Sequence, residues 1–179
     1  MHVILCGPKA VGKTTLATLL ARAWGWAHVD TDEAVLQHYR AHVNAVASVA
    51  EIYAHEGRER WLALEASVVR ELHCDRPTVI SVGGSTLLST ESAARLRCYG
   101  DIIYLRLSWV DYLQRLQFVT RLPDFLQTEP AQREYYHTRD QAYQQIAHSV
   151  VDVSVVQTPA QSLTQLMACL QASQDRLGT

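Results

Sequence analysis

The chain has 179 residues, of which 48% are hydrophobic and 19% are charged, and its formal net charge is −2. A chain of this size and apolar content forms one domain with a full core, and its near-neutral charge gives no reason to expect nucleic acid or an anionic membrane as a partner. The four cysteines lie far apart and include no C-x-x-C pair, which argues against a disulfide framework and against a metal cluster.

The N-terminus leads directly into a strand-like run, so we expect no signal peptide. No apolar run approaches the roughly 18 residues that a membrane span requires. We therefore expect a reduced, cytoplasmic enzyme that forms a single domain over residues 1–179. This size allows a monomer, which is the oligomeric state that we expect.

A glycine-rich loop connects the first strand-like run, His2–Cys6, to a helix-like run from Thr15 to Trp24. In a loop of this kind the backbone N–H groups surround phosphate oxygens, and the following helix adds the positive end of its dipole. Lys13 would neutralise β- and γ-phosphate charge, and the Thr14 hydroxyl would ligate Mg²⁺. The loop reads Gly7-Pro8-Lys9-Ala10-Val11-Gly12-Lys13-Thr14, the pattern G-x-x-x-x-G-K-T.

A chance glycine turn with an exposed lysine is the alternative interpretation, but the strand–loop–helix setting and every fixed position disfavour it. The loop therefore predicts a site for a nucleoside triphosphate. The expected contacts are Gly7, Ala10, Val11, Gly12, Lys13, Thr14 and Thr15.

The second strand-like run, Trp26–Val29, leads into Asp30-Thr31-Asp32. In an extended segment residues two apart point the same way, so both carboxylates are expected to face one cleft. Ligands in α/β sheets also bind beyond the carboxyl ends of the strands. Either aspartate alone could instead be the N-cap of a helix that begins near Glu33.

Three helices are expected next, over residues 33–40, 46–55 and 59–73. They are longer than a simple crossover between two strands needs. We interpret the segment of about residues 33–73 as a helical insertion that builds a substrate pocket.

The third strand-like run, Thr78–Val82, ends in Gly83-Gly84-Ser85, where many P-loop enzymes place an aspartate directed at Mg²⁺. Two glycines permit a close approach of the backbone and leave N–H groups free for a hydroxyl or a carboxylate. The carboxylate near Mg²⁺ must then come from elsewhere, and Asp30 is the best-placed candidate. A plain turn between a strand and a helix is the alternative.

The remaining strands are expected over Asp101–Leu105 and Ser149–Val153. Short aliphatic strands that alternate with helices predict a doubly wound α/β domain with ligands at the carboxyl ends of a parallel sheet. The remaining helices are expected over Glu91–Arg97, Trp109–Gln114, Pro130–His148 and Ala160–Gln174, followed by a frayed tail at residues 175–179.

Taken together, these features resemble the shikimate kinase family over nearly the whole chain. Family members share the phosphate loop, an Asp-x-Asp after the second strand (Asp30 and Asp32) and a Gly-Gly-Gly after the third (Gly83-Gly84-Ser85). The family motif G-E-x-x-F-R-x-x-E corresponds to residues 57–65, which read GRERWLALE. The family's R-P-L-L motif, in a lid expected at about residues 116–129, and its R-x-P-x-Y motif correspond to Arg121-Leu122-Pro123 and to residues 139–143, which read RDQAY.

The resemblance implies a three-layer α/β/α P-loop kinase fold with five parallel strands, and transfer of the ATP γ-phosphate to a hydroxyl of shikimate. Asp32 would hold the shikimate hydroxyls and act as, or orient toward, the base, while Asp30 would touch Mg²⁺ through water. The other implied roles are backbone contacts to the substrate from Gly83 and Gly84, pairing of Arg139 with the substrate carboxylate, charge stabilisation by Arg121, and enclosure of the adenine by Arg115 and Pro159. The three arginines could instead be solvated surface charges.

The acceptor half departs from the family pattern. Leu62 stands where the family has an arginine that grips the substrate carboxylate, and loss of such a donor costs about 2–5 kcal/mol. Arg58 could compensate because it lies four residues earlier on the same helix face, whereas Arg60 lies on a different face. The other departures are Ser85 for the third glycine, a lid proline displaced by one position, and Gln141 in place of a proline.

Two alternatives to shikimate phosphorylation stay open. Leu62 would suit another small hydroxylated acceptor with less anionic character. The altered acceptor motifs would also suit a nucleotide-binding regulatory module with little catalysis, although a decayed enzyme need not keep Lys13, Thr14, Asp32 and Arg121. A nucleoside monophosphate kinase is disfavoured, since the aspartate pair and the glycine turn favour a hydroxyl acceptor.

Overall fold

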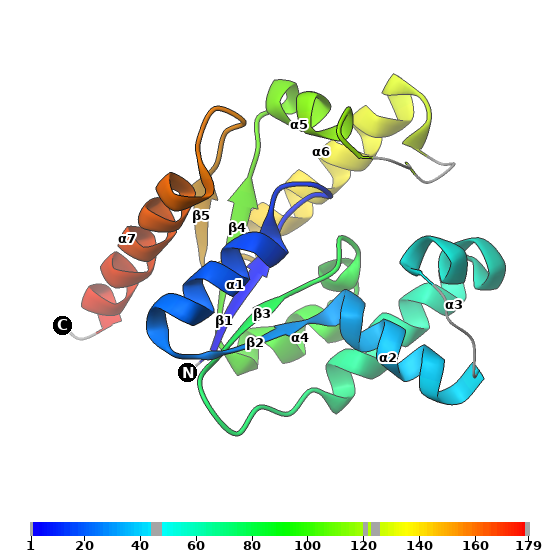
Figure 1. The fold of residues 1–179 in the computed structure, drawn as a ribbon, viewed down its shortest axis with the longest axis horizontal. Coiled ribbons are helices and arrows are strands. Elements are labelled where there is room, and N and C mark those ends of the chain that lie inside the picture. Colours follow the sequence, from blue (N-terminus) through cyan, green and yellow to red (C-terminus); the bar gives the residue numbers. More distant parts are fainter. Residues whose placement is uncertain (1, 44–47, 120–121, 123–125, 178–179) are drawn as a thin grey trace.

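The computed structural model describes residues 2–43, 48–119, 122 and 126–177. A five-stranded sheet lies at its centre, and all paired strands are parallel, in the order β2-β3-β1-β4-β5 (Figure 1). The strands are β1 (His2–Cys6), β2 (Ala27–Asp30), β3 (Thr78–Ser81), β4 (Asp101–Arg106) and β5 (Ser149–Asp152).

Helices connect the strands and cover the sheet. In the described part of the chain they are α1 (Lys13–Trp24), α2 (Thr31–Val43), α3 (Val49–Glu71), α4 (Thr90–Tyr99), α5 (Trp109–Leu116), α6 (Glu129–Ile146) and α7 (Pro159–Leu177). A 3₁₀ turn, η1 (Thr86–Leu88), follows β3. None of these helices is long and apolar enough to cross a membrane.

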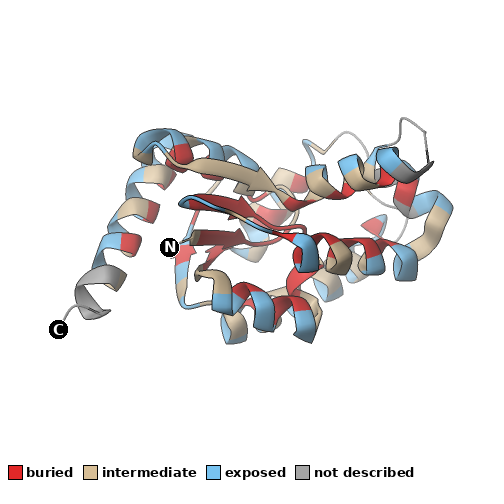
Figure 2. Ribbon diagram, turned by 90° about the horizontal axis from the view of Figure 1, so that it is seen from below, coloured by how far each residue is buried: buried red, intermediate tan, exposed pale blue. Residues whose placement is uncertain are grey.

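The alternation of side chains along β1 shows how the sheet joins two hydrophobic cores. Val3 and Leu5 pack in a cluster with residues of α1 and α7, whereas Ile4 and Cys6 pack in a second cluster with residues of α3 and α4. Both faces of the strands are therefore covered, and Figure 2 shows the buried strands between the helical layers. The predicted doubly wound, three-layer α/β/α fold is confirmed.

A third cluster joins α2 to α3, apart from the sheet. It consists of Val35, Tyr39, Ile52, Trp61, Leu64 and Val68. In Figure 1 these two helices lie on the opposite side of the sheet from α7. The pair thus has a small apolar core of its own beside the carboxyl ends of the strands.

One predicted boundary between helices is confirmed, and others were wrong. The break predicted between the helices at 46–55 and 59–73 lies at Gly57, where two helical segments of α3 meet at a kink (φ 80°, ψ 172°) that glycine adopts without steric cost. Helix α2 begins at Thr31 rather than near residue 33. At the other end of the chain α7 continues to Leu177, so residues 175–177 are helical rather than a frayed tail.

Candidate active site

The loop between β1 and α1 has the backbone geometry of an anion site. Gly7 and Gly12 have positive φ values of 153° and 98°, and a Cβ atom at Gly7 would lie 2.6 Å from the Leu105 carbonyl oxygen. Only glycine therefore fits at position 7. Gly12 caps α1 without a side-chain hydrogen bond, which leaves the first N–H groups of the helix for a ligand.

Lys13 folds back over this loop. Its Nζ donates hydrogen bonds to the carbonyl oxygens of Gly7 (3.0 Å) and Pro8 (3.1 Å). Burial lowers the pKa of Lys13, and the negative charges of Asp32 and Asp30 act in the opposite direction. The ammonium group is thus held at the mouth of the loop, where a phosphate chain would replace its carbonyl partners.

The Asp30 carboxylate, at the end of β2, accepts four hydrogen bonds. Its Oδ2 accepts from the hydroxyls of Thr14 (2.7 Å) and Ser81 (2.8 Å). Its Oδ1 accepts from the backbone N–H groups of Asp32 (3.0 Å) and Glu33 (3.4 Å), which are the bonds of a helix N-cap. These hard oxygens are ligands that a divalent cation prefers, and a cation held by one or two of them would share the phosphates of a nucleotide.

This geometry corrects one expectation from the sequence. Asp30 and Asp32 do not share an extended segment, because α2 begins between them at Thr31. Both carboxylates nevertheless line the same cavity. The N-cap interpretation of Asp30 is correct, and it holds together with the contact to Thr14.

The side chains of Asp32 and Glu65 converge on the same side of Gly83. A Cβ atom on Gly83 would approach Asp32 Oδ1 and Glu65 Oε1 to 2.5 Å each, so only glycine fits between them. Burial raises the pKa of Asp32, and the Lys13 charge opposes this shift. The pKa of Glu65 is also raised, mainly by burial, although it accepts hydrogen bonds from Ser85 Oγ (2.6 Å) and Thr86 Oγ1 (2.8 Å).

Arg139 projects from α6 toward the Gly83-Gly84 turn. Its Nε donates to the Gly84 carbonyl oxygen (2.8 Å), which also accepts from the Tyr143 hydroxyl (2.6 Å). The guanidinium carbon lies 3.4 Å from the centre of the Tyr135 ring. The guanidinium group is therefore held at Nε by the Gly84 carbonyl and across its face by the Tyr135 ring. Its two terminal nitrogens have the geometry that suits a carboxylate.

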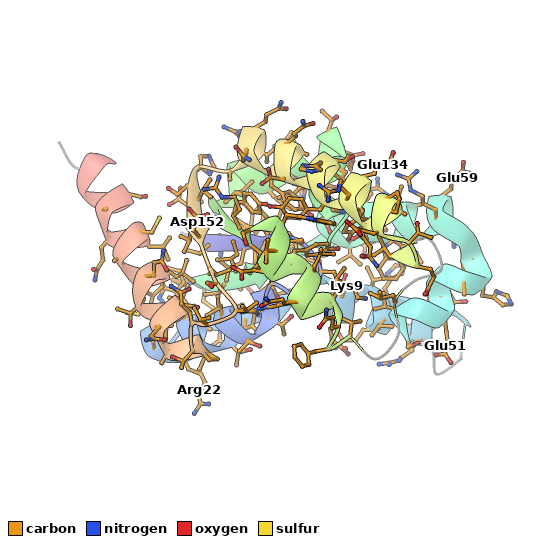
Figure 3. The ribbon with its side chains drawn as sticks, turned by 90° about the horizontal axis from the view of Figure 1, so that it is seen from above. Lys9, Arg22, Glu51, Glu59, Glu134 and Asp152 are labelled. Carbon is orange, nitrogen blue, oxygen red and sulfur yellow. The ribbon has the colours of Figure 1, made fainter. Side chains whose placement is uncertain are left out.

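These elements enclose one cavity of about 770 Å³. The predicted site residues that line it are Ala10, Gly12, Lys13, Thr14, Thr15, Asp30, Asp32, Arg58, Gly84 and Arg139. Leu62 lines it as well, so the residue in place of the family arginine faces the cavity. In Figure 3 Lys9 marks the phosphate loop, with Glu51 and Glu59 of α3 on one side of it and Arg22, near the end of α1, on the other.

Other predicted residues lie outside the lining. Gly7, Val11 and Gly83 are buried behind it. Arg115 donates to the carbonyl oxygens of Ala10 (3.3 Å), Val11 (3.2 Å) and Ser154 (3.2 Å), so it ties the phosphate loop to the segment before α7. Pro159 is the first residue of α7, and Arg121 and Pro123 lie outside the described residues.

The site contains side chains to which the sequence assigned no role. Glu65, Ser85 and Tyr135 all line the cavity. Glu65 is the last residue of the 57–65 motif, and that motif could have identified it as a site residue. Tyr135 lies four residues before Arg139, on the same face of α6, and that spacing could have suggested it.

The fold and the cavity can be compared with known proteins. The family model described as shikimate kinase matches residues 9–171. A shikimate kinase from Methylococcus capsulatus is 33% identical over 84% of this chain and 82% of its own length. One from Chromobacterium violaceum is 32% identical over 86% of this chain and 81% of its own length.

Solved structures agree with this match. A shikimate kinase from Acinetobacter baumannii, in complex with shikimate, is 26% identical with a TM-score of 0.79, over 97% of this chain and 93% of that one. A shikimate kinase from Bacteroides thetaiotaomicron also has a TM-score of 0.79, at 20% identity, over 96% and 98% of the two chains, and supports the fold.

Proposed function

The chain belongs to the shikimate kinase family, and from that premise we propose that it transfers the γ-phosphate of ATP to a hydroxyl of shikimate, producing shikimate 3-phosphate and ADP. One observation carries the proposal: the phosphate loop, Asp32 and Arg139 line a single cavity. A nucleotide and a small acid can therefore meet there with the acceptor hydroxyl beside a carboxylate.

The chemistry follows from these positions. The acceptor hydroxyl oxygen would form a bond to the γ-phosphorus as the bond from that phosphorus to the ADP oxygen breaks, and the hydroxyl proton would pass to Asp32. Burial raises the pKa of Asp32, which makes the carboxylate a better proton acceptor. Lys13 and the N–H groups of the loop would stabilise the phosphate charge, and Arg121 is predicted to add to this.

Thr14 would ligate Mg²⁺, and Asp30 would act on the ion from the outer shell, through water and through the Thr14 hydroxyl. The Thr14 hydroxyl donates a hydrogen bond to Asp30, so the lone pairs of the Thr14 oxygen stay available to a cation. Among the described residues no group of three or more histidine, cysteine or acidic side chains could hold a metal, which fits an ion shared with nucleotide phosphates rather than a closed protein cage. When bound, Mg²⁺ would neutralise charge on the β- and γ-phosphates.

Arg139 would pair with the acceptor carboxylate. Gly84 holds the guanidinium group at Nε and Tyr135 stacks on its face. The two terminal nitrogens are thereby oriented in advance to bind a planar anion such as a carboxylate. Arg58 lines the same cavity from α3 and is the second cation that could reach an acid there. We further propose a cytoplasmic monomer with ATP and a small molecule as its ligands, and with neither nucleic acid nor a membrane as a partner.

A second acceptor is supported by one observation. Leu62 lines the cavity, so this part of the wall offers no hydrogen bond to a carboxylate. A less anionic hydroxylated molecule would lose less binding free energy beside Leu62 than a carboxylic acid would. A regulatory module with little catalysis is the third possibility, and robust turnover with any acceptor would exclude it.

A coupled assay of ADP release tests these alternatives. Purified protein would be given ATP, Mg²⁺ and either shikimate or one of a panel of polyols and hydroxy acids. We expect shikimate to give the highest kcat/KM, whereas turnover with another acceptor alone would replace our proposal by the second one. A Leu62→Arg variant should lower the KM for shikimate if the missing donor limits binding.

The role of Arg58 has a matched control in the same helix. Arg58→Ala should raise the KM for shikimate, while Arg60→Ala, which removes an exposed charge that does not line the cavity, should leave it unchanged. Equal KM values in the two variants would remove Arg58 from the acceptor site.

A further inference from the structure

A row of polar side chains runs behind the phosphate loop, between α1 and the edge of the sheet. His28 and Asp30 are two apart on β2 and so point to one face, and Ser81 of β3 stands opposite Asp30 in the parallel register. Thr14 and Thr18 are one turn apart on α1, which packs over these two strands. Side chains from three elements therefore meet in one line.

Hydrogen bonds connect this row. His28 Nε2 lies 3.0 Å from Ser81 Oγ, and Ser81 Oγ lies 2.8 Å from Asp30 Oδ2. Asp30 Oδ2 also accepts a hydrogen bond from the Thr14 hydroxyl (2.7 Å). At the far end His28 Nδ1 lies 3.4 Å from Thr18 Oγ1, whose own proton is donated to the Thr14 carbonyl oxygen (2.8 Å).

The number of protons fixes the direction of the bonds that join His28, Ser81 and Asp30. The Asp30 carboxylate can only accept hydrogen bonds, so the single hydroxyl proton of Ser81 must point toward Asp30. Ser81 Oγ can then only accept from His28, which places a proton on Nε2 of the ring. A hydroxyl that accepts one hydrogen bond becomes a stronger donor in the next, so His28 strengthens the bond from Ser81 to Asp30.

The same count shows what Asp30 contributes. Its carboxylate has about four lone-pair directions, and the bonds from Thr14, Ser81 and two N–H groups of α2 use four. A carboxylate held in this way cannot rotate without losing a partner. It therefore fixes the Thr14 hydroxyl, with the oxygen lone pairs directed away from Asp30.

We propose that His28 is a positioning residue for the divalent cation of the nucleotide, acting through Ser81 and Asp30 on the Thr14 hydroxyl. The inference rests on the proposed binding of Mg²⁺ with a nucleotide but not on the identity of the acceptor. Outer partners of metal ligands commonly change metal affinity by about 10- to 100-fold when they are removed. His28 and Ser81 have this relation to Thr14, with Asp30 between them.

The test measures binding rather than turnover. A fluorescent ADP analogue would be titrated into the protein in EDTA and then at increasing Mg²⁺ concentrations, which gives the affinity for ADP alone and the apparent dissociation constant of Mg²⁺. We expect Ser81→Ala and His28→Phe to raise the Mg²⁺ constant by about 10-fold or more while the ADP affinity in EDTA changes little. His28→Gln, whose amide can still donate to Ser81, should recover part of the loss.

Ser162→Ala is the matched control, because it removes another buried serine hydroxyl, on α7 and outside the row. It should leave the Mg²⁺ constant unchanged whatever its effect on thermal stability. Nitrogen NMR of the histidine rings should also find the His28 proton on Nε2 in wild type.

An unchanged Mg²⁺ constant in both Ser81→Ala and His28→Phe would overturn the inference. The inference would also be overturned if these variants lost as much ADP affinity in EDTA as in Mg²⁺. Such a result would show that His28 and Ser81 support the fold of the loop and do not position the cation. Because no acceptor is present in the experiment, the outcome does not depend on whether shikimate is phosphorylated. If wild type binds ADP no more tightly with Mg²⁺ than in EDTA, the proposed cation site itself is wrong.

Discussion

At the scale of single residues, the acceptor end of the cavity depends on how one arginine is held. The Arg139 guanidinium stacks on the Tyr135 ring and donates to the Gly84 carbonyl oxygen. A free arginine side chain loses rotamer freedom when it grips a carboxylate, and a stacked one has lost most of it beforehand. If Arg139 pairs with the acceptor carboxylate as proposed, Tyr135 should therefore add to the affinity for an acid without a hydrogen bond to that acid.

Replacement of Tyr135 by leucine should raise the KM for shikimate by about 2- to 30-fold, which corresponds to the 0.5–2 kcal/mol of a cation–π contact. The kcat should change little, because the ring does not contact the reacting atoms. Tyr135→Phe keeps the ring face and should remain close to wild type. Steady-state kinetics at saturating ATP would measure both, and equal KM increases in the two variants would argue against stacking as the cause.

In the proposed mechanism Asp32 is the residue that accepts the hydroxyl proton. Asp32→Asn keeps the shape of the side chain but removes its ability to accept the hydroxyl proton, so kcat should fall by about 100-fold or more. The affinity for ADP should change far less, because the phosphate loop is untouched. Glu33→Gln, one position along and exposed, serves as the control with near-normal kcat. A kcat within a few-fold of wild type in Asp32→Asn would transfer the role of base to another group.

At the scale of elements, the kink in α3 decides how the helix meets the cavity. Gly57 interrupts the helix with a left-handed φ of 80°, and Arg58, Trp61, Leu62 and Glu65, which line the cavity, follow it within two turns. The first part of α3, with Ile52, packs in the same cluster as the second, with Leu64. Val49 and Ala54, before the kink, also line the cavity, so both parts of α3 contribute to the small α2–α3 core and to the cavity wall.

Gly57→Ala should destabilise the protein by about 1–3 kcal/mol, because its φ and ψ lie in a region that only glycine adopts readily, even though no atom lies within 4 Å of the added Cβ. It should also raise the KM for shikimate, since the residues after the kink would move. Gly25→Ala is the control, because Gly25 has a φ of 67° with equally open space, at the end of α1 and away from the cavity. Urea unfolding should give a smaller loss for Gly25→Ala, whose ψ of 26° lies in the left-handed helical region. An equal change of the acceptor KM in both variants would show that the kink does not act on the acceptor site.

The elements also show which parts of the structure could be predicted from the sequence. Each of the five strands lies within a residue or two of its predicted place, because short aliphatic runs between glycine-rich or polar turns carry a strong local signal. The start of α2 was misplaced because Asp30 caps the helix while it also bonds to Thr14 and Ser81 from other elements. Local pattern contains no information about such contacts.

The same limit applies to the site. The phosphate loop is one continuous segment, so its geometry could be predicted as a unit. The stacking of Tyr135 on Arg139 and the place of Glu65 beside Gly83 depend on how α3, α6 and the turn after β3 pack together. Spacing in the sequence does not specify such packing.

At the scale of the whole molecule, the parallel sheet brings distant segments to one edge. The phosphate loop follows β1, Asp30 ends β2 and the Gly83-Gly84 turn follows β3, so three adjacent strands supply the two halves of the site. Helices α3 and α6 then close the acceptor half with Glu65 and Arg139. Because Glu65 is only 2% exposed, its ionisation is coupled to folding of the entire domain.

The pH dependence of unfolding should reveal this coupling. The pKa of Glu65 is raised in the folded protein above the ordinary value of 4.5, mainly by burial. Between the unfolded and folded pKa values the folded state binds more protons, so this group's contribution to stability is complete below the unfolded pKa and is lost as pH rises through the folded pKa. Glu65→Gln cannot titrate, so the difference in unfolding free energy between wild type and variant should shift against wild type as pH rises from about 4 toward neutral.

Urea unfolding at several pH values would measure that difference. Glu59→Gln, an exposed position on the same helix, should give a difference that does not vary with pH. The subtraction removes the contributions of the other titrating groups, so a slope in the Glu65→Gln series belongs to Glu65 and the groups that it contacts. A flat difference in both series would mean that Glu65 ionises as easily in the folded domain as in the unfolded chain, and its place between Asp32, Ser85 and Thr86 would then carry no electrostatic cost.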